Sequence, residues 1–228
     1  MAKPAAAVRK RGDPEQTRRR VLDAAIATVV EVGYYKASSN EIARRAGVTW
    51  GSIQHLFGSR EQLMLDVVND IGVRLEESFA AATVEGATLE DRLRSVLGIL
   101  STHYEQDAYL VQMQILLELA ANPKMSAHGR KVMGRDNGQE LDNLAQPLLA
   151  QALGDVAAEH DLVMYAFMTL RGYLASSAVA RIIARFPDDA VRRLIRDSED
   201  DNVRRDLLVR GVAAMVREEG TRRGYRVD

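Results

Sequence analysis

Helical spacing of apolar residues along nearly the whole chain is the feature that most restricts its fold. In residues 14–32 the apolar side chains recur every three or four positions, which places them on one face of an α-helix. They are Val21, Leu22, Ala25, Ile26, Val29 and Val30. A half-buried strand would instead alternate at every second residue, and no segment does so. We therefore predict an all-α chain.

Composition excludes several classes of protein. The 228 residues are 46% hydrophobic and 28% charged, enough to bury a core in one or two domains. The chain has no Cys, which excludes disulfides, thiolate catalysis and Cys-bound zinc. Its histidines are too dispersed for a metal motif, so we expect no metal and no cofactor. With no apolar run near 18 residues and no signal sequence at the N-terminus, we expect a cytoplasmic protein without a membrane span.

Charge is divided unevenly along the chain. Residues 1–60 hold 11 Lys or Arg against 5 Asp or Glu, whereas residues 61–228 hold 20 against 27. The net charges are therefore +6 and −7, which suggests that only the first segment meets a polyanion. Charge alone leaves a second interpretation equally open, namely a solvated tail followed by a charged helix face.

Capping residues, glycines and prolines divide the chain into about nine helices. They are expected at 14–32, 38–46, 49–57, 59–82, from 88 onward, and at 109–121, 125–152, 156–185 and 202–219, with Pro147 kinking or breaking the helix over 125–152. We predict four parts: a flexible basic arm over 1–12, a DNA-binding domain over 13–58, a larger helical domain over 59–219, and a flexible tail over 220–228.

Two short helices joined at Gly47 predict a helix-turn-helix. The second helix of such a pair lies in the major groove of DNA, where the base edges distinguish all four base pairs. Here that helix starts with Thr49, Trp50, Gly51 and Ser52, and short or polar residues at this point let a backbone approach the bases.

The same segment strongly resembles the tetracycline-repressor (TetR) family of bacterial transcription regulators. Residues 38–49 (SSNEIARRAGVT) are similar to that family's second helix and turn. Residues 51–57 (GSIQHLF) and 59–63 (SREQL) are similar to its recognition helix and the start of its fourth helix. The resemblance runs from Thr17 to Val67. It implies a regulator, most often a repressor, that a small apolar or weakly polar ligand releases from a palindromic operator.

The resemblance also implies which residues meet DNA. The expected contacts are Ser38, Ser39, Arg44, Thr49, Trp50, Gly51, Ser52, Gln54, His55 and Arg60. Ser38, Ser39 and Arg60 correspond to positions that bind phosphate, and 49–52 to positions that read bases. Trp50 is either a DNA contact or a packed surface aromatic. Arg44, like the arm residues Arg9, Lys10 and Arg11, is either a phosphate contact or merely solvated.

The rest of the chain is expected to bind the ligand and to form a homodimer. Pocket candidates are Phe79, Leu100, His103, Tyr104, Met113, Leu117, Met133, Leu141, Met164, Met168 and Tyr173. Dimer-interface candidates are Leu170, Leu174, Ala178, Ile182, Leu208, Val212 and Met215. No charged cluster lies in the pocket set, so the ligand is expected to be apolar or weakly polar. The helix over 59–82 would couple pocket and DNA-binding domain.

Two alternative functions make different demands on the chain. A DNA-binding regulator or architectural protein without an effector would have a packed, pocketless body. An enzyme would need His103 and Tyr104 beside a carboxylate such as Glu118. Since the sequence shows no nucleophile, metal or phosphate-loop motif, we predict that the chain is not an enzyme.

Overall fold

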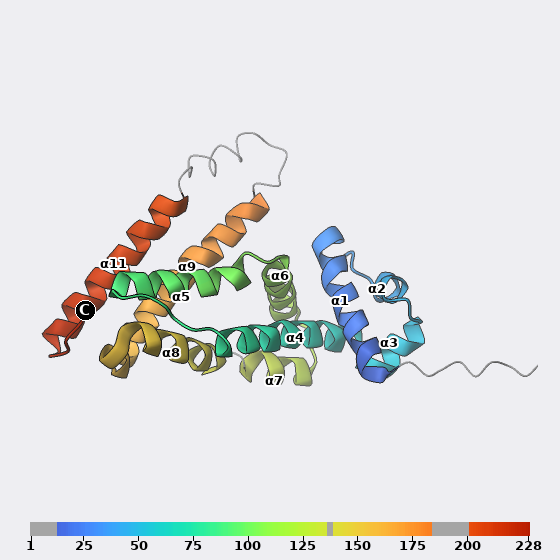
Figure 1. Cartoon of the computed structure of the whole chain (residues 1–228). Helices are drawn as coiled ribbons and strands as arrows, with labels where there is room; N and C mark the ends of the chain where they lie inside the picture. Colours follow the sequence, from blue (N-terminus) through green and yellow to red (C-terminus); the bar gives the residue numbers. More distant parts are fainter. Residues whose placement is uncertain (1–12, 136–138, 184–200) are drawn as a thin grey trace, which may run out of the picture.

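The computed structural model describes residues 13–135, 139–183 and 201–228, and within them every regular element is a helix (Figure 1). The all-α prediction is confirmed. The elements are α1 (Pro14–Val32), α2 (Ser39–Ala46), α3 (Trp50–Phe57), α4 (Arg60–Ala80), α5 (Leu89–Tyr104), α6 (Asp107–Ala121), α7 (Ala127–Arg135), α8 (Gln139–Leu153), the 3-10 helix η1 (Gly154–Ala158), α9 (His160–Ile183) and α11 (Asp201–Arg222).

The helices of the N-terminal half begin where the capping residues predict. Ser38, Thr49 and Ser59 each accept a hydrogen bond from the backbone N–H three residues later, which satisfies one of the free donors at a helix start. Thr88 forms a reciprocal capping box with Asp91.

Within the helix expected over 125–152 the structure describes two helices, α7 ending at Arg135 and α8 beginning at Gln139, and residues 136–138 lie outside the described part of the chain. Pro147 lies inside α8 without ending it. The neighbouring Leu148 and Leu149 are each 1% exposed, so burial of α8 offsets the hydrogen bond that proline removes.

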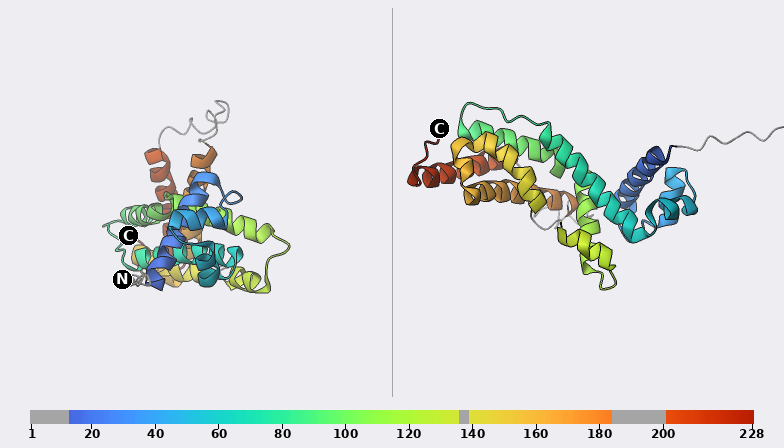
Figure 2. Two further views of the ribbon diagram at one scale, coloured as in Figure 1. Left: turned by 90° about the vertical axis from the view of Figure 1, so that its right-hand side faces the viewer. Right: turned by 90° about the horizontal axis from the view of Figure 1, so that it is seen from below.

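The chain has two hydrophobic cores, and α4 and α6 contribute to both. Ile42, Ile53 and Leu63 belong to the core at the N-terminal end, which we call the head. The second core, in the body, is built from α4, α5, α6, α8, α9 and α11. Figures 1 and 2 show α4 running from the head into the body, with α6 crossing it. The head core therefore does not end at residue 58.

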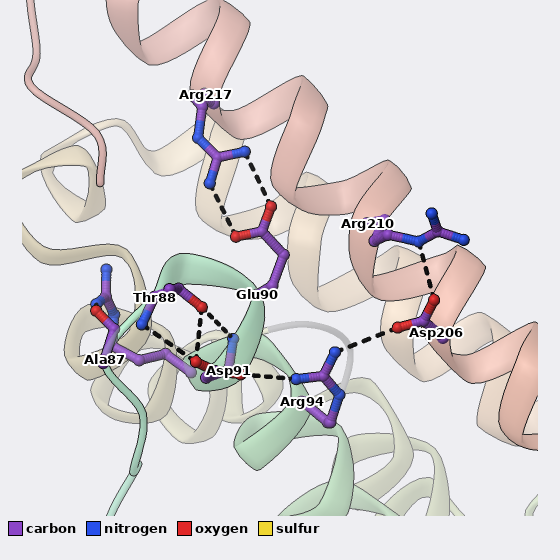
Figure 3. Close-up of polar contacts among 9 residues, drawn as sticks. Ala87, Thr88, Glu90, Asp91, Arg94, Asp206, Arg210 and Arg217 are labelled. Carbon is purple, nitrogen blue, oxygen red and sulfur yellow. Dashed lines mark hydrogen bonds and ion pairs between the residues drawn. The ribbon is translucent and has the colours of Figure 1, made fainter.

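Ion pairs fasten α11 to the start of α5 (Figure 3). Both Nη atoms of Arg217 donate to the Glu90 carboxylate, at 3.0 and 2.8 Å. Arg94 donates to Asp91 at 2.8 Å and to Asp206 of α11 at 3.2 Å. These contacts fix which face of α11 meets α5.

The C-terminal residues pack against the body, which corrects the prediction of a flexible tail over 220–228. Arg223 donates to Asp161 at 2.7 Å, and the Tyr225 hydroxyl donates to Glu159 at 2.7 Å. The backbone N–H of Leu89 donates to the carbonyl of Asp228 at 3.2 Å. The short polar segment is held by partners distant in sequence, which periodicity cannot reveal.

Helix α9 is long and apolar enough to cross a membrane by composition alone. In this fold it is a core helix, because Leu162, Ala166 and Leu170 are each at most 2% exposed. Its Arg171 Nε donates to the Tyr104 hydroxyl at 2.9 Å. An apolar helix of this kind needs neighbours on more than one side.

Candidate nucleic-acid interface

Helices α2 and α3 form a helix-turn-helix whose turn is set by Gly47. This residue is left-handed, with φ 65° and ψ 35°, a conformation that glycine adopts without a steric penalty. Ile42 on α2 and both Ile53 and Phe57 on α3 are buried in the head core. Because these side chains point inward, the opposite face of α3 is left to solvent.

That exposed face carries four of the residues expected to contact DNA. Trp50, Gly51, Gln54 and His55 are all exposed, and their spacing places them on one side of α3. Trp50 is 39% exposed, so the protein covers part of its side chain and the rest faces solvent. The face combines an aromatic ring, an amide and an imidazole, which suit the mixed donors, acceptors and methyl groups of the major groove.

Thr49 and Ser52 are tied to each other at the start of α3. The Ser52 N–H donates to Thr49 Oγ1 at 3.1 Å, and the two hydroxyl oxygens are 3.0 Å apart. The shared hydrogen bond fixes the orientation of both hydroxyls at the end of the helix where free N–H groups favour an anion.

Packing within the chain does not require a glycine at position 51. A Cβ built there would lie 3.7 Å from Thr49 Oγ1, an ordinary contact. Glycine inside a helix costs up to about 1 kcal/mol relative to alanine. The missing side chain thus leaves room for something outside the chain to approach the backbone of α3.

Ser38 and Ser39 lie at the start of α2. Ser38 Oγ accepts from the Glu41 N–H at 3.2 Å, which leaves its own hydroxyl hydrogen able to donate outward. Ser39 is half-buried at the first helical position. Both lie where phosphate contacts were expected.

Arg60 is held inside the head. Its Nη2 donates to the Tyr34 carbonyl at 2.6 Å, and its Nε to the Ala37 carbonyl at 3.4 Å. Its guanidinium also stacks over the Tyr34 ring, 4.2 Å from the centroid. A guanidinium used in this way braces the α1–α2 loop, so a phosphate contact through Arg60 stays a prediction.

Arg44 and Arg45 share the carboxylate of Glu41. Arg44 donates to it at 2.9 and 2.6 Å, and Arg45 at 2.6 Å. Hydrogen bonds from these two arginines lower the pKa of Glu41 to about 2, so the carboxylate stays ionised. Arg44 is largely exposed and can still turn outward, whereas Arg45 is also bound to Glu31 at 2.5 Å.

Much of the head's basic excess is neutralised or lies outside the described residues. Arg9, Lys10 and Arg11 fall outside them. Arg18 pairs with Asp66 on α4 at 2.9 Å. Within 13–60 there are only seven Lys or Arg against five Asp or Glu. The local arrangement of donors on α2 and α3, more than net charge, therefore characterises this surface.

A cleft of about 120 Å³ lies at the junction of head and body. Helices α1, α4 and α5 and the start of α6 contribute its walls. The lining residues are Ile26, Ile71, Arg74, Leu75, Ser78, Thr102, His103, Gln106 and Ala108. The cleft thus mixes apolar walls with hydroxyl, amide and imidazole groups, as small-molecule sites do.

His103 is the buried polar group of this cleft. It is 9% exposed and packs edge-on against Tyr104 and Tyr109, with ring centroids 5.2 and 5.4 Å away. Burial, with a smaller effect from the charge of Arg171, lowers its pKa to about 4. At neutral pH the imidazole is therefore uncharged, with one donor and one acceptor nitrogen.

Of the predicted pocket residues, only His103 lines this cleft. Phe79, Leu100 and Tyr104 are buried in the body core, and Met113, Met164 and Tyr173 pack against it. The prediction that Leu117 and Met168 line an interior pocket is wrong, because they are 70% and 49% exposed. The side chains of Met133 and Leu141 lie outside the described part of the chain. The sequence analysis missed Ile26, Ile71 and Arg74, which come from α1 and from the middle of α4.

The predicted dimer residues largely face the chain's own core and not its surface. Leu170, Leu174, Ala178 and Val212 are at most 2% exposed within one chain, which corrects their assignment to a surface. Ile182, Leu208 and Met215 are partly buried against the same core. Apolar residues with period 3.6 on two faces of a helix give no signal for which face is internal.

The opposite faces of α9 and α11 are apolar and exposed. On α9 they carry Tyr165, Met168 and Val179, and on α11 Val203 and Leu207. Gly172 and Gly211 continue the same helical rows, and a Cβ at either would meet nothing within 4 Å. The two helices pack side by side (Figure 1).

The residues considered for catalysis do not converge. Glu118 accepts a hydrogen bond from the Tyr35 hydroxyl at the head, whereas Tyr104 is bound to Arg171 in the body. Among the described residues no group of three or more His, Asp or Glu side chains is placed to hold a metal ion.

Residues 21–67 match the family model of bacterial regulatory proteins of the tetR family. The HTH-type transcriptional regulator BetI of Rhizobium meliloti is 33% identical over 86 residues, which are 37% of this chain and 42% of that protein. The similarity to this relative thus spans less than half of the relative's length.

Solved structures share the fold over nearly the whole chain. A transcriptional regulator from Pseudomonas aeruginosa PAO1 matches with a TM-score of 0.64 at 17% identity, over 96% of this chain and 99% of the other. The regulator FadR from Bacillus subtilis, solved with stearoyl-CoA, matches with a TM-score of 0.50 at 18% identity, over 87% and 96%.

Proposed function

Because the N-terminal domain of this chain belongs to the tetR family of bacterial regulatory proteins, we propose that the protein is a sequence-specific DNA-binding transcription regulator. The observation that carries this proposal is the exposed face of α3. It presents Trp50, Gln54 and His55 around a glycine that the chain itself does not require. Such a surface can lie close to base edges in a major groove.

We propose that the functional unit is a homodimer joined through α9 and α11. One recognition helix contacts too few base pairs for useful specificity, and a two-fold dimer reads a palindrome. Met168 and Leu207 lie on exposed apolar faces, and Gly172 and Gly211 leave space for a second pair of helices to approach closely. Apolar faces of this kind mark association surfaces.

We propose that the effector binds in the junction cleft and is a small, uncharged molecule with one or two hydrogen-bonding groups. The one cationic side chain in the lining, Arg74, is paired with Asp23 at 2.8 Å and with Asp70 at 2.5 Å. His103 is neutral, so the cleft does not favour an anion. A space of about 120 Å³ is far too small for a ligand of the size of stearoyl-CoA.

Because the cleft lies between head and body, a ligand bound there can change the affinity for DNA. Its walls belong both to α1 of the head and to α5 of the body, and α4 passes between them. A ligand that fits better when these walls move apart would shift the distance between the two recognition helices. The free energy of operator binding that is lost equals the difference between the ligand's binding free energies for the two arrangements. Repression, released by this ligand in the cytoplasm, is the form of regulation we propose.

Selection of bound duplexes from random DNA by the full chain tests the DNA-binding function. A palindromic sequence should be enriched, and the emission of Trp50, the single tryptophan, should change when that duplex binds. Enrichment of no sequence, together with unchanged Trp50 emission, would contradict the proposal. A screen of small neutral compounds against the bound duplex then tests release.

A further inference from the structure

A short basic segment lies beside the head, outside the helix-turn-helix. Residues 122–135 contain four Lys or Arg and no Asp or Glu, although residues 61–228 as a whole carry a net charge of −7. Lys124 and Lys131 are exposed, and among the described residues neither ammonium group has a hydrogen bond or ion pair. The segment is therefore locally basic, and it carries two lysines whose ammonium groups face solvent.

The segment is fixed to the first turn of α4. Ser126 N–H donates to the two carboxylate oxygens of Glu61 at 3.3 and 3.2 Å, and the Ser126 hydroxyl donates to the same carboxylate. Gly129 permits this approach, because a Cβ there would lie 2.7 Å from Glu61 Oε1. Glu61 follows Arg60, and α4 starts only three residues after α3 ends.

The same segment is also part of the head's packing. Met125 is 7% exposed and lies in the buried cluster that contains Ile53 of α3 and Leu63 of α4. Lys124 is its direct neighbour, so its backbone is held in a set position relative to the recognition helix. Figure 1 shows α7 running along α4, on the side of α1–α3 that faces the body.

We propose that Lys124 and Lys131 form a second DNA contact, which binds phosphates of the duplex flanking the bases that α3 reads. The inference rests on the proposed DNA-binding function. Lysine binds phosphate as a point charge without requiring a particular base, so this contact adds affinity and no sequence preference. Duplex DNA is the partner because residues 122–135 hold four Lys or Arg and no acidic residue, and because Met125 lies in the same buried cluster as Ile53 of the helix that enters the groove.

Two selected duplexes of different length test the contact. One contains the palindrome alone, and the other extends it by about ten base pairs on each side. Wild-type protein should bind the longer duplex about tenfold more tightly near 0.1 M salt, and the double variant K124A/K131A should lose that gain. Each phosphate contact contributes about 0.9 to the slope of log affinity against log salt, so the slope should fall by roughly two to four per dimer.

The matched control removes two cations far from the head. In R222A/R226A the charge change is the same, but both residues lie at the opposite end of the molecule, near the C-terminus (Figure 1). This variant should bind both duplexes as wild type does. Unfolding midpoints of wild type and K124A/K131A should agree, because the lysines are exposed and their ammonium groups make no polar contact among the described residues.

The outcomes separate the inference from the function on which it rests. If K124A/K131A binds both duplexes with wild-type affinity and salt slope, the second contact is wrong and the DNA-binding function stands. If wild-type protein itself enriches no sequence, the function fails first and the inference fails with it. Ethylation of flanking phosphates should also weaken wild-type binding to the level of K124A/K131A and leave the affinity of that variant unchanged.

Discussion

The guanidinium of Arg60 lies 4.2 Å from the centroid of the Tyr34 ring while Nη2 donates to the carbonyl of the same residue at 2.6 Å. A residue at the start of α4 thereby holds the loop between α1 and α2. Because α2 carries Ser38 and Ser39 at its start, this pair sets where the expected phosphate-binding hydroxyls lie relative to α3.

Arg60→Ala should therefore destabilise the head as well as weaken DNA binding. Loss of the stacking and of one good hydrogen bond should lower the free energy of unfolding by about 1–2 kcal/mol. Arg60→Lys keeps the charge but not the planar geometry, and should lose most of the same stability. Urea unfolding of both variants measures this. Arg20→Ala is the control, because Arg20 is exposed and, among the described residues, its side chain bonds only to Thr17, at 3.4 Å. Unchanged stability in Arg60→Ala, with a reduced salt slope of DNA binding, would instead indicate a direct phosphate contact.

Gly51→Ala should separate the stability of the protein from its function. The new methyl group has room, so the free protein should gain up to about 1 kcal/mol. The same methyl group would stand between α3 and the groove, and operator affinity should fall about tenfold or more. Gly98→Ala on α5 is the matched control, since a Cβ there would meet nothing within 4 Å and Gly98 lies in the body. It should stabilise the chain and leave DNA binding unchanged; equal affinities for the two variants would argue against close approach at Gly51.

The head could be predicted from sequence because its signals are local. The caps at Ser38 and Ser59 and the end of α2 at Gly47 each depend on residues within one helical turn, and all appear as expected. Arg60 shows the limit of that reasoning. Its partners lie 23 and 26 residues away, and nothing near Arg60 in the sequence indicates them.

The body was harder because its site depends on which helix faces are internal. Leu170 and Met168 are both apolar residues on α9, but one is fully buried and the other half exposed. Periodicity locates a helix and its apolar rows, but it does not say which row meets the chain's own core. The junction cleft was missed for the same reason, since Ile26 and Ile71 belong to helices assigned to separate domains.

Met168→Glu should prevent dimerisation without unfolding the chain. A carboxylate on this exposed apolar face would be buried without a partner in the dimer, whereas in the monomer it stays in water. The dimer dissociation constant should rise by about 100-fold, which sedimentation equilibrium measures. Leu117→Glu is the control, because Leu117 is a large apolar residue on α6 that is 70% exposed. A monomer in both variants, or a dimer in both, would contradict the assignment of α9 to the interface.

His103→Phe should remove a pH dependence of stability that the wild-type protein shows in mild acid. Burial lowers the pKa of His103 from 6.5 to about 4, so between these values the unfolded chain binds a proton that the folded chain does not. Protonation then favours the unfolded state, and stability present above pH 6.5 is lost progressively as the pH falls toward 4. The full loss is roughly 3 kcal/mol.

Phenylalanine keeps the ring packed against Tyr104 and Tyr109 but cannot titrate. Urea unfolding at pH 7.0, 6.0 and 5.0 should thus show a steeper decline for wild type than for His103→Phe. His128→Phe is the control, because His128 is exposed on α7. Parallel declines in wild type and His103→Phe would show that the imidazole is not held neutral. In that case the cleft would accommodate a charged histidine, and the proposal of an uncharged effector would lose its basis.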